Sequence, residues 1–171
     1  HDFMSGIESG VKNMVPAYLI LIMAWTISGV CRDLLMTGEY VRGIVESSSH
    51  PPAIIPALIF VIAAFLSFSM GTAWGTFGIL IPIIGPVCSA IAPQLIIVSL
   101  SATLAGSVFG DHCSPISDTT ILSSTGAGCQ HIEHVSTQLP YALTVACCCF
   151  VGYVVAGFSG GNVVLTLASA I

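Results

Sequence analysis

Charged residues are scarce in this sequence. They make up 6% of its 171 residues, whereas hydrophobic residues make up 55%. Soluble domains carry about 25% charged residues, so this composition excludes an ordinary soluble domain and indicates an integral membrane protein. A membrane-spanning helix takes about 20 apolar residues, which leaves room for roughly five or six such segments. We therefore expect an all-α integral membrane protein embedded in a lipid bilayer.

Lysine and arginine are almost absent. The chain contains only Lys12, Arg32 and Arg42, so no strongly basic side chain follows residue 42. The net charge of −5 excludes the basic surface that a nucleic acid would need. Asp111 and Asp118 consequently have no lysine or arginine near them in the sequence.

The seven cysteines form no C-x-x-C pair, and three of them are consecutive at 147–149. Consecutive residues of a helix point about 100° apart, so these three side chains cannot converge on one metal ion. They are typical of small apolar residues that pack or face lipid. We expect no disulfide framework and no bound cofactor.

Hydrophobic runs and the breaks between them define the expected membrane elements. The whole chain, 1–171, is expected to be a single transmembrane region, and a polar connection is expected at 125–138. Two hydrophobic runs are interrupted. The first is interrupted by glycine and hydroxyl residues at 67–78 and then by prolines 82, 86 and 93, and the second is interrupted near 110–115. Interrupted membrane helices indicate a transporter's binding site, because irregular backbone must be buried in protein or line a wet cavity. The expected elements are 15–31, 53–70, 72–92, 94–126, interrupted near 110–115, and 138–158.

The second interruption, "FGDHCSPISDTTILSS" at 109–124, concentrates polar residues between apolar segments. Ser114 followed by Pro115 is expected to begin a half-helix, with serine as the N-cap and proline in the first position. Asp111 then lies just beyond the carbonyl end of the preceding half-helix, and Asp118 lies in the first turn of the next. The carbonyl end of a helix carries partial negative charge, which suits a cation.

The side chains of this stretch are mostly oxygen donors, which hard cations such as Na⁺ prefer. Carboxylates at membrane depth need compensating charge from a proton, a histidinium, a bound cation or a lysine elsewhere in the protein. Burial raises a carboxylate's pKa and a nearby cation lowers it. A site at which H⁺ and a metal ion compete for one carboxylate is therefore what an antiporter needs. A purely helix-capping role is the alternative, above all for Ser114. The candidate ion-binding residues here are Asp111, Asp118, Ser114, Ser117, Thr119 and His112.

Two further groups of polar residues are weaker candidates. Ser69 and Thr72 could supply ion contacts, although small hydroxyl residues near glycines are equally typical of helix packing. Cys129, His131 and His134 are ligand types that could bind zinc. Their spacing matches no closed structural site, and a solvated loop or a pH-responsive cluster is the favoured interpretation.

The segment "GDHCSPISDTTILSSTGAGCQHIEHVSTQLPYAL" at 110–143 closely resembles the NhaC-type family of bacterial sodium/proton antiporters. "AWTISGVC" at 24–31 and "SFSMGTAWGTFGILIPI" at 67–83 resemble later segments of the same family. The resemblance implies the C-terminal part of a longer multi-pass transporter of the bacterial cytoplasmic membrane, whose N-terminal part would be its partner. It also implies inverted structural repeats, each with a broken helix and a re-entrant hairpin, and it leaves homo-oligomer formation open. By this analogy Asp111 and Asp118 are the first candidates for ion binding.

The leading functional hypothesis is exchange of Na⁺ for H⁺ through these aspartates, with Na⁺ and H⁺ as cargo and no enzymatic activity. The alternative is a Na⁺- or H⁺-coupled exchanger of small carboxylates or amino acids, because a half-helix N-terminus near Ser114 could hold a carboxylate. An intramembrane aspartic protease is a remote alternative. Its two aspartates would share a proton and lie on separate helices, one of them in a G-x-G-D pattern, whereas Val108 replaces the first glycine here.

Overall fold

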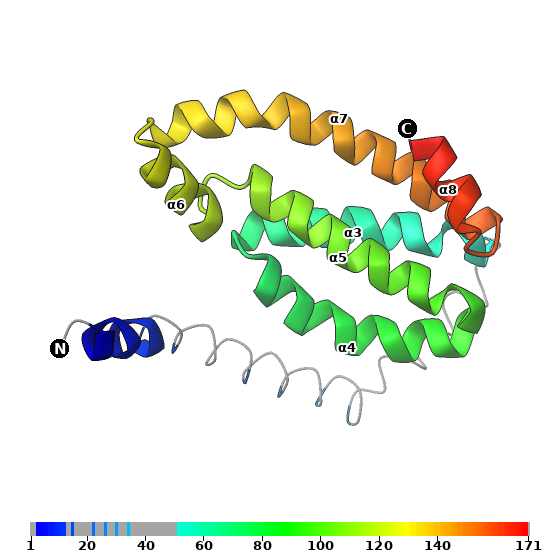
Figure 1. Ribbon diagram of the computed structural model, residues 1–171. Helices are drawn as coiled ribbons and strands as arrows, with labels where there is room; N and C mark the ends of the chain where they lie inside the picture. Colours follow the sequence, from blue (N-terminus) through cyan, green and yellow to red (C-terminus); the bar gives the residue numbers. More distant parts are fainter. Residues whose placement is uncertain are drawn as a thin grey trace.

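A computed structural model describes residues 3–12, 15, 22, 26, 30, 34 and 51–170, and these residues form helices and turns without any strand (Figure 1). The prediction of an all-α protein is therefore confirmed for this part of the chain. The first expected membrane element, 15–31, lies outside the described residues apart from single positions.

From residue 51 onward the chain alternates long helices with short connections. Within the described residues, four stretches are long and apolar enough to cross a membrane: Pro52–Met70, Ala73–Ile91, Pro93–Cys113 and His131–Phe158. Large apolar side chains cover much of their outer surface, as expected for helices that face lipid. The elements are η1 (Pro52–Ile54), α3 (Ile55–Met70), α4 (Ala73–Ile91), η2 (Pro93–Leu95), α5 (Ile96–Cys113), α6 (Asp118–Ala127), α7 (His131–Phe158) and α8 (Val163–Ala170).

Helix α4 differs from the sequence prediction because it continues through Pro82 and Pro86. The predicted break at these prolines is wrong. A proline removes one backbone hydrogen bond, but membrane helices tolerate the loss because neighbouring groups and local adjustments satisfy the freed carbonyl. Pro93, by contrast, does begin a new turn, in the first position of η2.

The connection before α7 is shorter than predicted. Residues 125–127 belong to α6 and the polar residues 131–138 belong to α7, so the expected connection at 125–138 is wrong except at 128–130. The helix is 28 residues long, which corresponds to about 42 Å at 1.5 Å per residue and exceeds the roughly 30 Å apolar layer of a bilayer. The helix is thus longer than the apolar layer is thick, its first turns are polar, and Glu133 in the first turn suits the positive end of the helix dipole.

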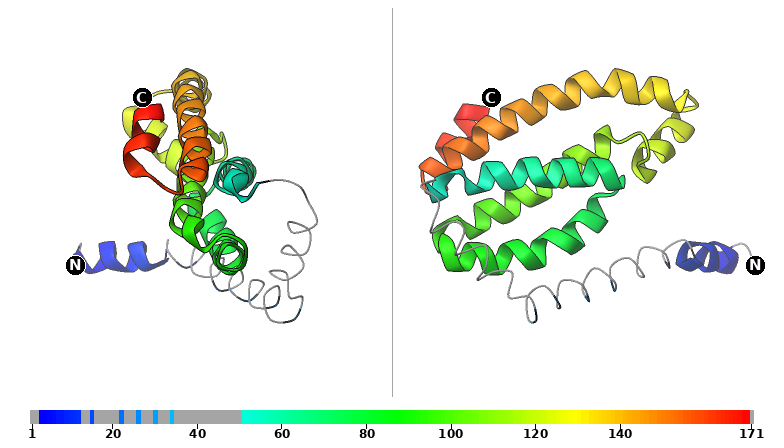
Figure 2. Two further views of the ribbon diagram at one scale, coloured as in Figure 1. Left: turned by 90° about the vertical axis from the view of Figure 1, so that its right-hand side faces the viewer. Right: turned by 180° about the vertical axis from the view of Figure 1, so that it is seen from behind.

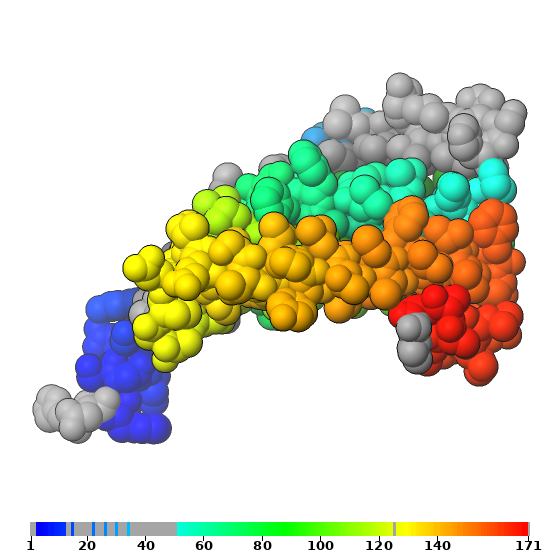
Figure 3. All heavy atoms as spheres, turned by 90° about the horizontal axis from the view of Figure 1, so that it is seen from above, coloured from blue at the N-terminus to red at the C-terminus, as the bar shows by residue number. Residues whose placement is uncertain are grey.

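Helices α3 and α5 lie side by side at the centre of the bundle, with α4 on one side and α7 on the other (Figures 1 and 2). Helix α8 folds back on the C-terminal end of α7, and α6 lies beside its N-terminal end. Seen from above, α7 runs along the whole face with α3 next to it (Figure 3). The buried apolar core joins all four long helices through residues such as Phe60, Leu80, Ala102 and Ala146.

The closest helix pair is α3 with α5, and two glycines permit it. A Cβ atom at Gly106 or Gly110 would collide with the backbone of α3, at Phe60 and Ala64 respectively. Small residues let membrane helices approach closely in this way. Ser67 Oγ of α3 also donates a hydrogen bond of 2.6 Å to a carbonyl of α5. This pairing fixes the end of α5, where Asp111 lies.

Candidate functional site

The break in the membrane helix lies between Cys113, where α5 ends, and Asp118, where α6 begins. Ser114 has extended backbone at the C-terminal end of α5, and its Oγ donates a 2.8 Å hydrogen bond to the carbonyl of Phe68 on α3. Residues 114–117 then form one turn, in which Ser117 N–H donates to the Ser114 carbonyl at 3.3 Å. The loop is thus held against the end of α3.

Ser117, and not Ser114, caps helix α6. Its Oγ accepts from Thr120 N–H at 3.4 Å, and its carbonyl accepts from Ile121 N–H at 2.9 Å. The prediction that Ser114 and Pro115 begin the half-helix is wrong by three residues. Ser114 does not cap α6, because its Oγ accepts from Ile116 N–H at 3.4 Å, within the turn that precedes the helix, while its hydrogen is donated to α3.

Asp111 is buried at the end of α5 with 6% of its surface exposed. Its Oδ1 accepts a hydrogen bond of 2.7 Å from Ser117 Oγ, and its Oδ2 accepts one of 2.9 Å from Thr119 Oγ1. The two hydroxyl oxygens are themselves 2.7 Å apart. The carboxylate has no ion pair within the described residues, where Lys12 pairs with Glu8. Asp111, Ser117 and Thr119 therefore form a compact cluster of four oxygen atoms.

Three buried hydroxyl residues, which the sequence analysis missed, lead along α5 to this cluster. Ser99, Thr103 and Ser107 precede Asp111 at intervals of four residues and are fully buried. Thr103 and Ser107 donate to the carbonyls of Ser99 and Thr103 at 2.9 and 2.7 Å, whereas Ser99 Oγ, beside the Cys88 thiol, has no hydrogen bond of standard geometry. Their four-residue spacing inside an apolar run is the signal that could have revealed them.

Asp118 does not join the oxygen cluster. It lies exposed in the first turn of α6, where a carboxylate suits the positive end of the helix dipole. The structure thus separates the two aspartates into one buried and one exposed group. A proton shared between them, as an aspartic protease requires, is incompatible with this difference.

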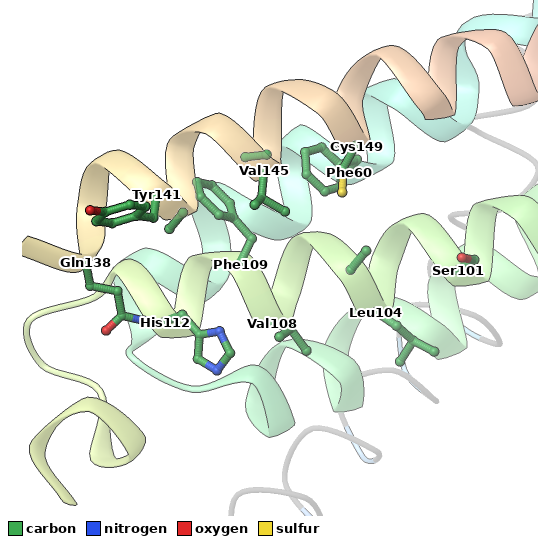
Figure 4. Close-up of a pocket in the computed structure, with 13 residues that line it drawn as sticks. Phe60, Ser101, Leu104, Val108, Phe109, His112, Gln138, Tyr141, Val145 and Cys149 are labelled. Carbon is green, nitrogen blue, oxygen red and sulfur yellow. The ribbon is translucent and has the colours of Figure 1, made fainter. Parts of the chain in front are cut away.

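His112 also points away from the cluster. It lies about 100° around α5 from Asp111 and lines a cavity of about 660 Å³ between α5 and α7 (Figure 4). The walls of this cavity are mostly apolar, with Phe109 and Val145 among them, and Gln138 lies at the same end as His112. The cavity is therefore separate from the Asp111 cluster.

The remaining candidate hydroxyls serve their own helices. Ser69 is exposed, and its Oγ donates to the carbonyl of Phe65 at 2.9 Å on the same helix. Thr72 caps α4 by accepting from Gly75 N–H at 3.4 Å. Within the segment 67–78 only Gly71 and Thr72 lie between the two membrane-crossing helices, and neither hydroxyl reaches the Asp111 cluster by a hydrogen bond.

The histidines and cysteine near the start of α7 do not gather into a metal site. Within the described residues, no group of three or more histidine, cysteine, aspartate or glutamate side chains could hold a metal ion. His131 instead has both ring nitrogens in hydrogen bonds, Nε2 with the Pro115 carbonyl at 2.6 Å and Nδ1 with Ser124 Oγ at 3.2 Å.

Four long apolar helices, one of which continues through a break into α6 and carries a buried carboxylate, are the arrangement of a multi-pass membrane transporter. Comparison with known proteins agrees. The model of the Na⁺/H⁺ antiporter family matches residues 1–158, and the chain belongs to this family.

Three curated relatives are similar along most of the chain. An uncharacterized protein of Haemophilus influenzae is 49% identical over 95% of this chain, and an uncharacterized Na⁺/H⁺ antiporter of the same organism is 30% identical over 81%. A malate-2H⁺/Na⁺-lactate antiporter of Bacillus subtilis is 28% identical over 94%. The chain spans about a third of the length of these relatives, at 31%, 29% and 34% respectively. No solved structure matches the chain.

Proposed function

We propose that this chain carries the ion-binding site of a secondary antiporter that exchanges Na⁺ for H⁺ across the bacterial cytoplasmic membrane. In this proposal Asp111 binds the two ions alternately, and Ser117 and Thr119 complete the site. Further helices of the whole protein would form the second half of an inverted repeat and expose the site to each side in turn. The observation that carries the proposal is the set of three short oxygen–oxygen contacts around the buried carboxyl group of Asp111.

The cluster has three short oxygen–oxygen contacts but only two hydroxyl protons. Ser117 and Thr119 each donate to one oxygen of Asp111, which leaves their mutual 2.7 Å contact without a hydrogen. If Asp111 is protonated, the carboxyl group supplies the third proton and all three contacts become hydrogen bonds. A protonated Asp111 therefore satisfies every short contact in the cluster.

The same oxygens suit Na⁺ once that proton leaves. A hard cation that contacts the carboxylate and both hydroxyl oxygens removes the need for the third hydrogen. It also neutralises the carboxylate, which no lysine or arginine after residue 42 could do. One site thus accommodates either H⁺ or Na⁺ but not both, which is the requirement for exchange.

The decisive experiment measures Na⁺-dependent proton movement in vesicles that contain the full-length protein. We expect added Na⁺ to collapse a pH gradient with the wild-type protein and to have no effect with Asp111→Asn. Asparagine keeps the shape of the side chain and supplies N–H hydrogens to the cluster, but it cannot release a proton. Asp118→Asn is the matched control, because this aspartate is exposed, and it should retain exchange.

Normal Na⁺/H⁺ exchange by Asp111→Asn would contradict the proposal. Loss of exchange by Asp118→Asn, with Asp111→Asn active, would assign the site to α6 instead.

Exchange of small carboxylates is the second candidate function. It rests on the 28% identity to the malate-2H⁺/Na⁺-lactate antiporter of Bacillus subtilis. The same vesicles, loaded with lactate and diluted into malate with and without Na⁺, distinguish the two functions. Proton movement that needs malate or lactate, with none driven by Na⁺ alone, would favour this candidate.

A further inference from the structure

His131 connects three parts of the chain that surround the break in the membrane helix. It is the first residue of α7, its Nε2 lies 2.6 Å from the carbonyl of Pro115 in the loop, and its Nδ1 lies 3.2 Å from Ser124 Oγ on α6. Pro115 lies two residues before Ser117, so the ring holds the loop that supplies a hydroxyl to Asp111. His131 touches none of the four oxygens of the cluster itself.

The protons on these groups can be counted. The Pro115 carbonyl only accepts, so Nε2 must carry a hydrogen. Ser124 Oγ, which is buried, donates its single hydrogen to the carbonyl of Ile121 at 2.9 Å. Its contact with Nδ1 is then a hydrogen bond only if Nδ1 also carries a hydrogen. All three bonds exist together only when the imidazole ring is protonated on both nitrogens.

We propose that His131 is a positioning residue whose protonation fastens the loop 114–117 to α6 and α7 and so holds Ser117 against Asp111. The consequence for transport rests on the proposed function of Asp111. The imidazolium closes all three bonds, of which two are charge-assisted and therefore stronger. The neutral ring with its hydrogen on Nε2 keeps the bond to the Pro115 carbonyl, but without charge assistance, and Ser124 then donates either to Ile121 or to Nδ1. The loop is fastened at acidic pH and looser at alkaline pH.

Other titratable and charged groups on the neighbouring elements are few. Between residues 114 and 134 the other titratable side chains are those of Asp118 on α6, Cys129 in the turn, and Glu133 and His134 on α7. The end of α5 adds Asp111, His112 and Cys113. None of them forms an ion pair with His131 within the described residues.

A merely structural histidine would hold the loop equally at every pH. We call His131 and its bonds to Pro115 and Ser124 the clasp. Because the clasp is strongest when the ring is protonated, we expect the loop to loosen as pH rises through the range in which histidine changes charge, between about pH 5 and 8. Two uncharged variants separate these possibilities. In His131→Gln the amide nitrogen can replace Nε2 toward Pro115, and in His131→Asn it can replace Nδ1 toward Ser124. His134→Gln is the control, because the ring of His134 makes no hydrogen bond within the described residues.

The first measurement is hydrogen–deuterium exchange of segment 114–124 in the full-length protein, held in lipid nanodiscs, at pH 5.5 and 8. Exchange is corrected for the intrinsic effect of pH. The amides of Ser114 and Ser117 report directly on the loop, since both are hydrogen-bonded in it. For the wild type and His134→Gln we expect about tenfold stronger protection at pH 5.5, the size of one charge-assisted hydrogen bond. For His131→Gln and His131→Asn we expect protection that does not change with pH.

The second measurement is Na⁺-dependent proton movement by the same proteins over the same pH range. Competition between protons and Na⁺ at Asp111 should make transport rise with pH, and this rise should be steeper in both His131 variants than in the wild type, whose loop loosens at alkaline pH. Equal pH dependence of loop protection in the wild type and in both His131 variants would overturn the clasp. A different outcome is possible, in which loop protection depends on pH as expected but neither the wild type nor any variant moves protons in response to Na⁺. This outcome would support the role of His131 and contradict the proposed function of Asp111.

Discussion

At the scale of single residues, Asp111 and Asp118 show that burial determines which carboxylate is suited to bind an ion. Both are aspartates of one motif, seven positions apart in the sequence. Asp111 is buried with both of its oxygens in hydrogen bonds from hydroxyls, whereas Asp118 is exposed at a helix start. A buried, unpaired carboxylate is costly unless a proton or a cation compensates it. The structure therefore separates two residues that the sequence had ranked together.

Removing one hydroxyl of the cluster should weaken Na⁺ binding. Thr119→Val deletes the hydroxyl that donates to Asp111 Oδ2 but keeps the shape of the side chain. A hydrogen bond to a charged group contributes about 1.5–3 kcal/mol, so the apparent KM for Na⁺ should rise roughly 10- to 100-fold. The measurement is the Na⁺ concentration dependence of proton movement in vesicles. Thr119→Ser, which keeps the hydroxyl, is the control, and an unchanged KM in Thr119→Val would remove Thr119 from the site.

At the scale of secondary-structure elements, the contact between α3 and α5 positions the site. Helix α3 presents its backbone to Gly106 and Gly110, and Ser114 returns a hydrogen bond to the end of α3. Gly71, which ends α3 with a φ of 67°, lies against Ile116 of the loop, where a side chain would meet the Ile116 backbone. The left-handed conformation and the lack of space both require glycine there. The end of α3 thus forms the support on which the loop rests.

A methyl group between these helices should destabilise the bundle. In Gly110→Ala the added Cβ would meet the backbone of Ala64 and Phe68 on α3. Overpacking of this kind costs about 1–3 kcal/mol, so the protein should unfold at a lower temperature and show weaker exchange. Gly85→Ala on α4 is the matched control, since its Cβ would meet nothing within 4 Å. Thermal unfolding of both variants in the same detergent measures the difference, and equal melting temperatures would contradict the close contact.

At the scale of the whole molecule, the described helices sort cysteine side chains into different surroundings. Cys88 is fully buried between helices, Cys147 is exposed along α7, and Cys129 is exposed in the turn between α6 and α7. An exposed residue inside a long apolar helix faces lipid or further helices of the protein, whereas one in a polar connecting turn is expected to meet water. The same three thiols can therefore report on the orientation of the bundle in the bilayer.

Labelling with a membrane-impermeant maleimide should distinguish the three cysteines. In single-cysteine versions of the full-length protein, Cys129 should react, whereas Cys88 and Cys147 should not, because thiolate formation needs water. Labelling after denaturation is the control for each thiol. Rapid reaction of Cys147 in the folded protein would mean that α7 lines a water-filled path and does not face lipid.

The sequence by itself determined the class of the protein. Composition alone requires helices in a membrane, because an apolar environment forces every backbone group into an internal hydrogen bond. The motif at 109–124 also places the break in the helix correctly to within a few residues. The absence of lysine and arginine after residue 42 identifies carboxylates that need a proton or a cation.

Only the tertiary structure decided which residues of the motif act together. Local rules favoured Ser114 as the cap of the half-helix, but its hydroxyl goes to the carbonyl of Phe68, 46 residues away in the sequence. They could not show that Asp111 is buried and Asp118 exposed, or that Ser107 and its neighbours lie against α3. The contact of His131 with Pro115 likewise joins residues 16 positions apart. Burial and hydrogen bonding depend on which helices meet, and the local pattern of one segment does not contain that information.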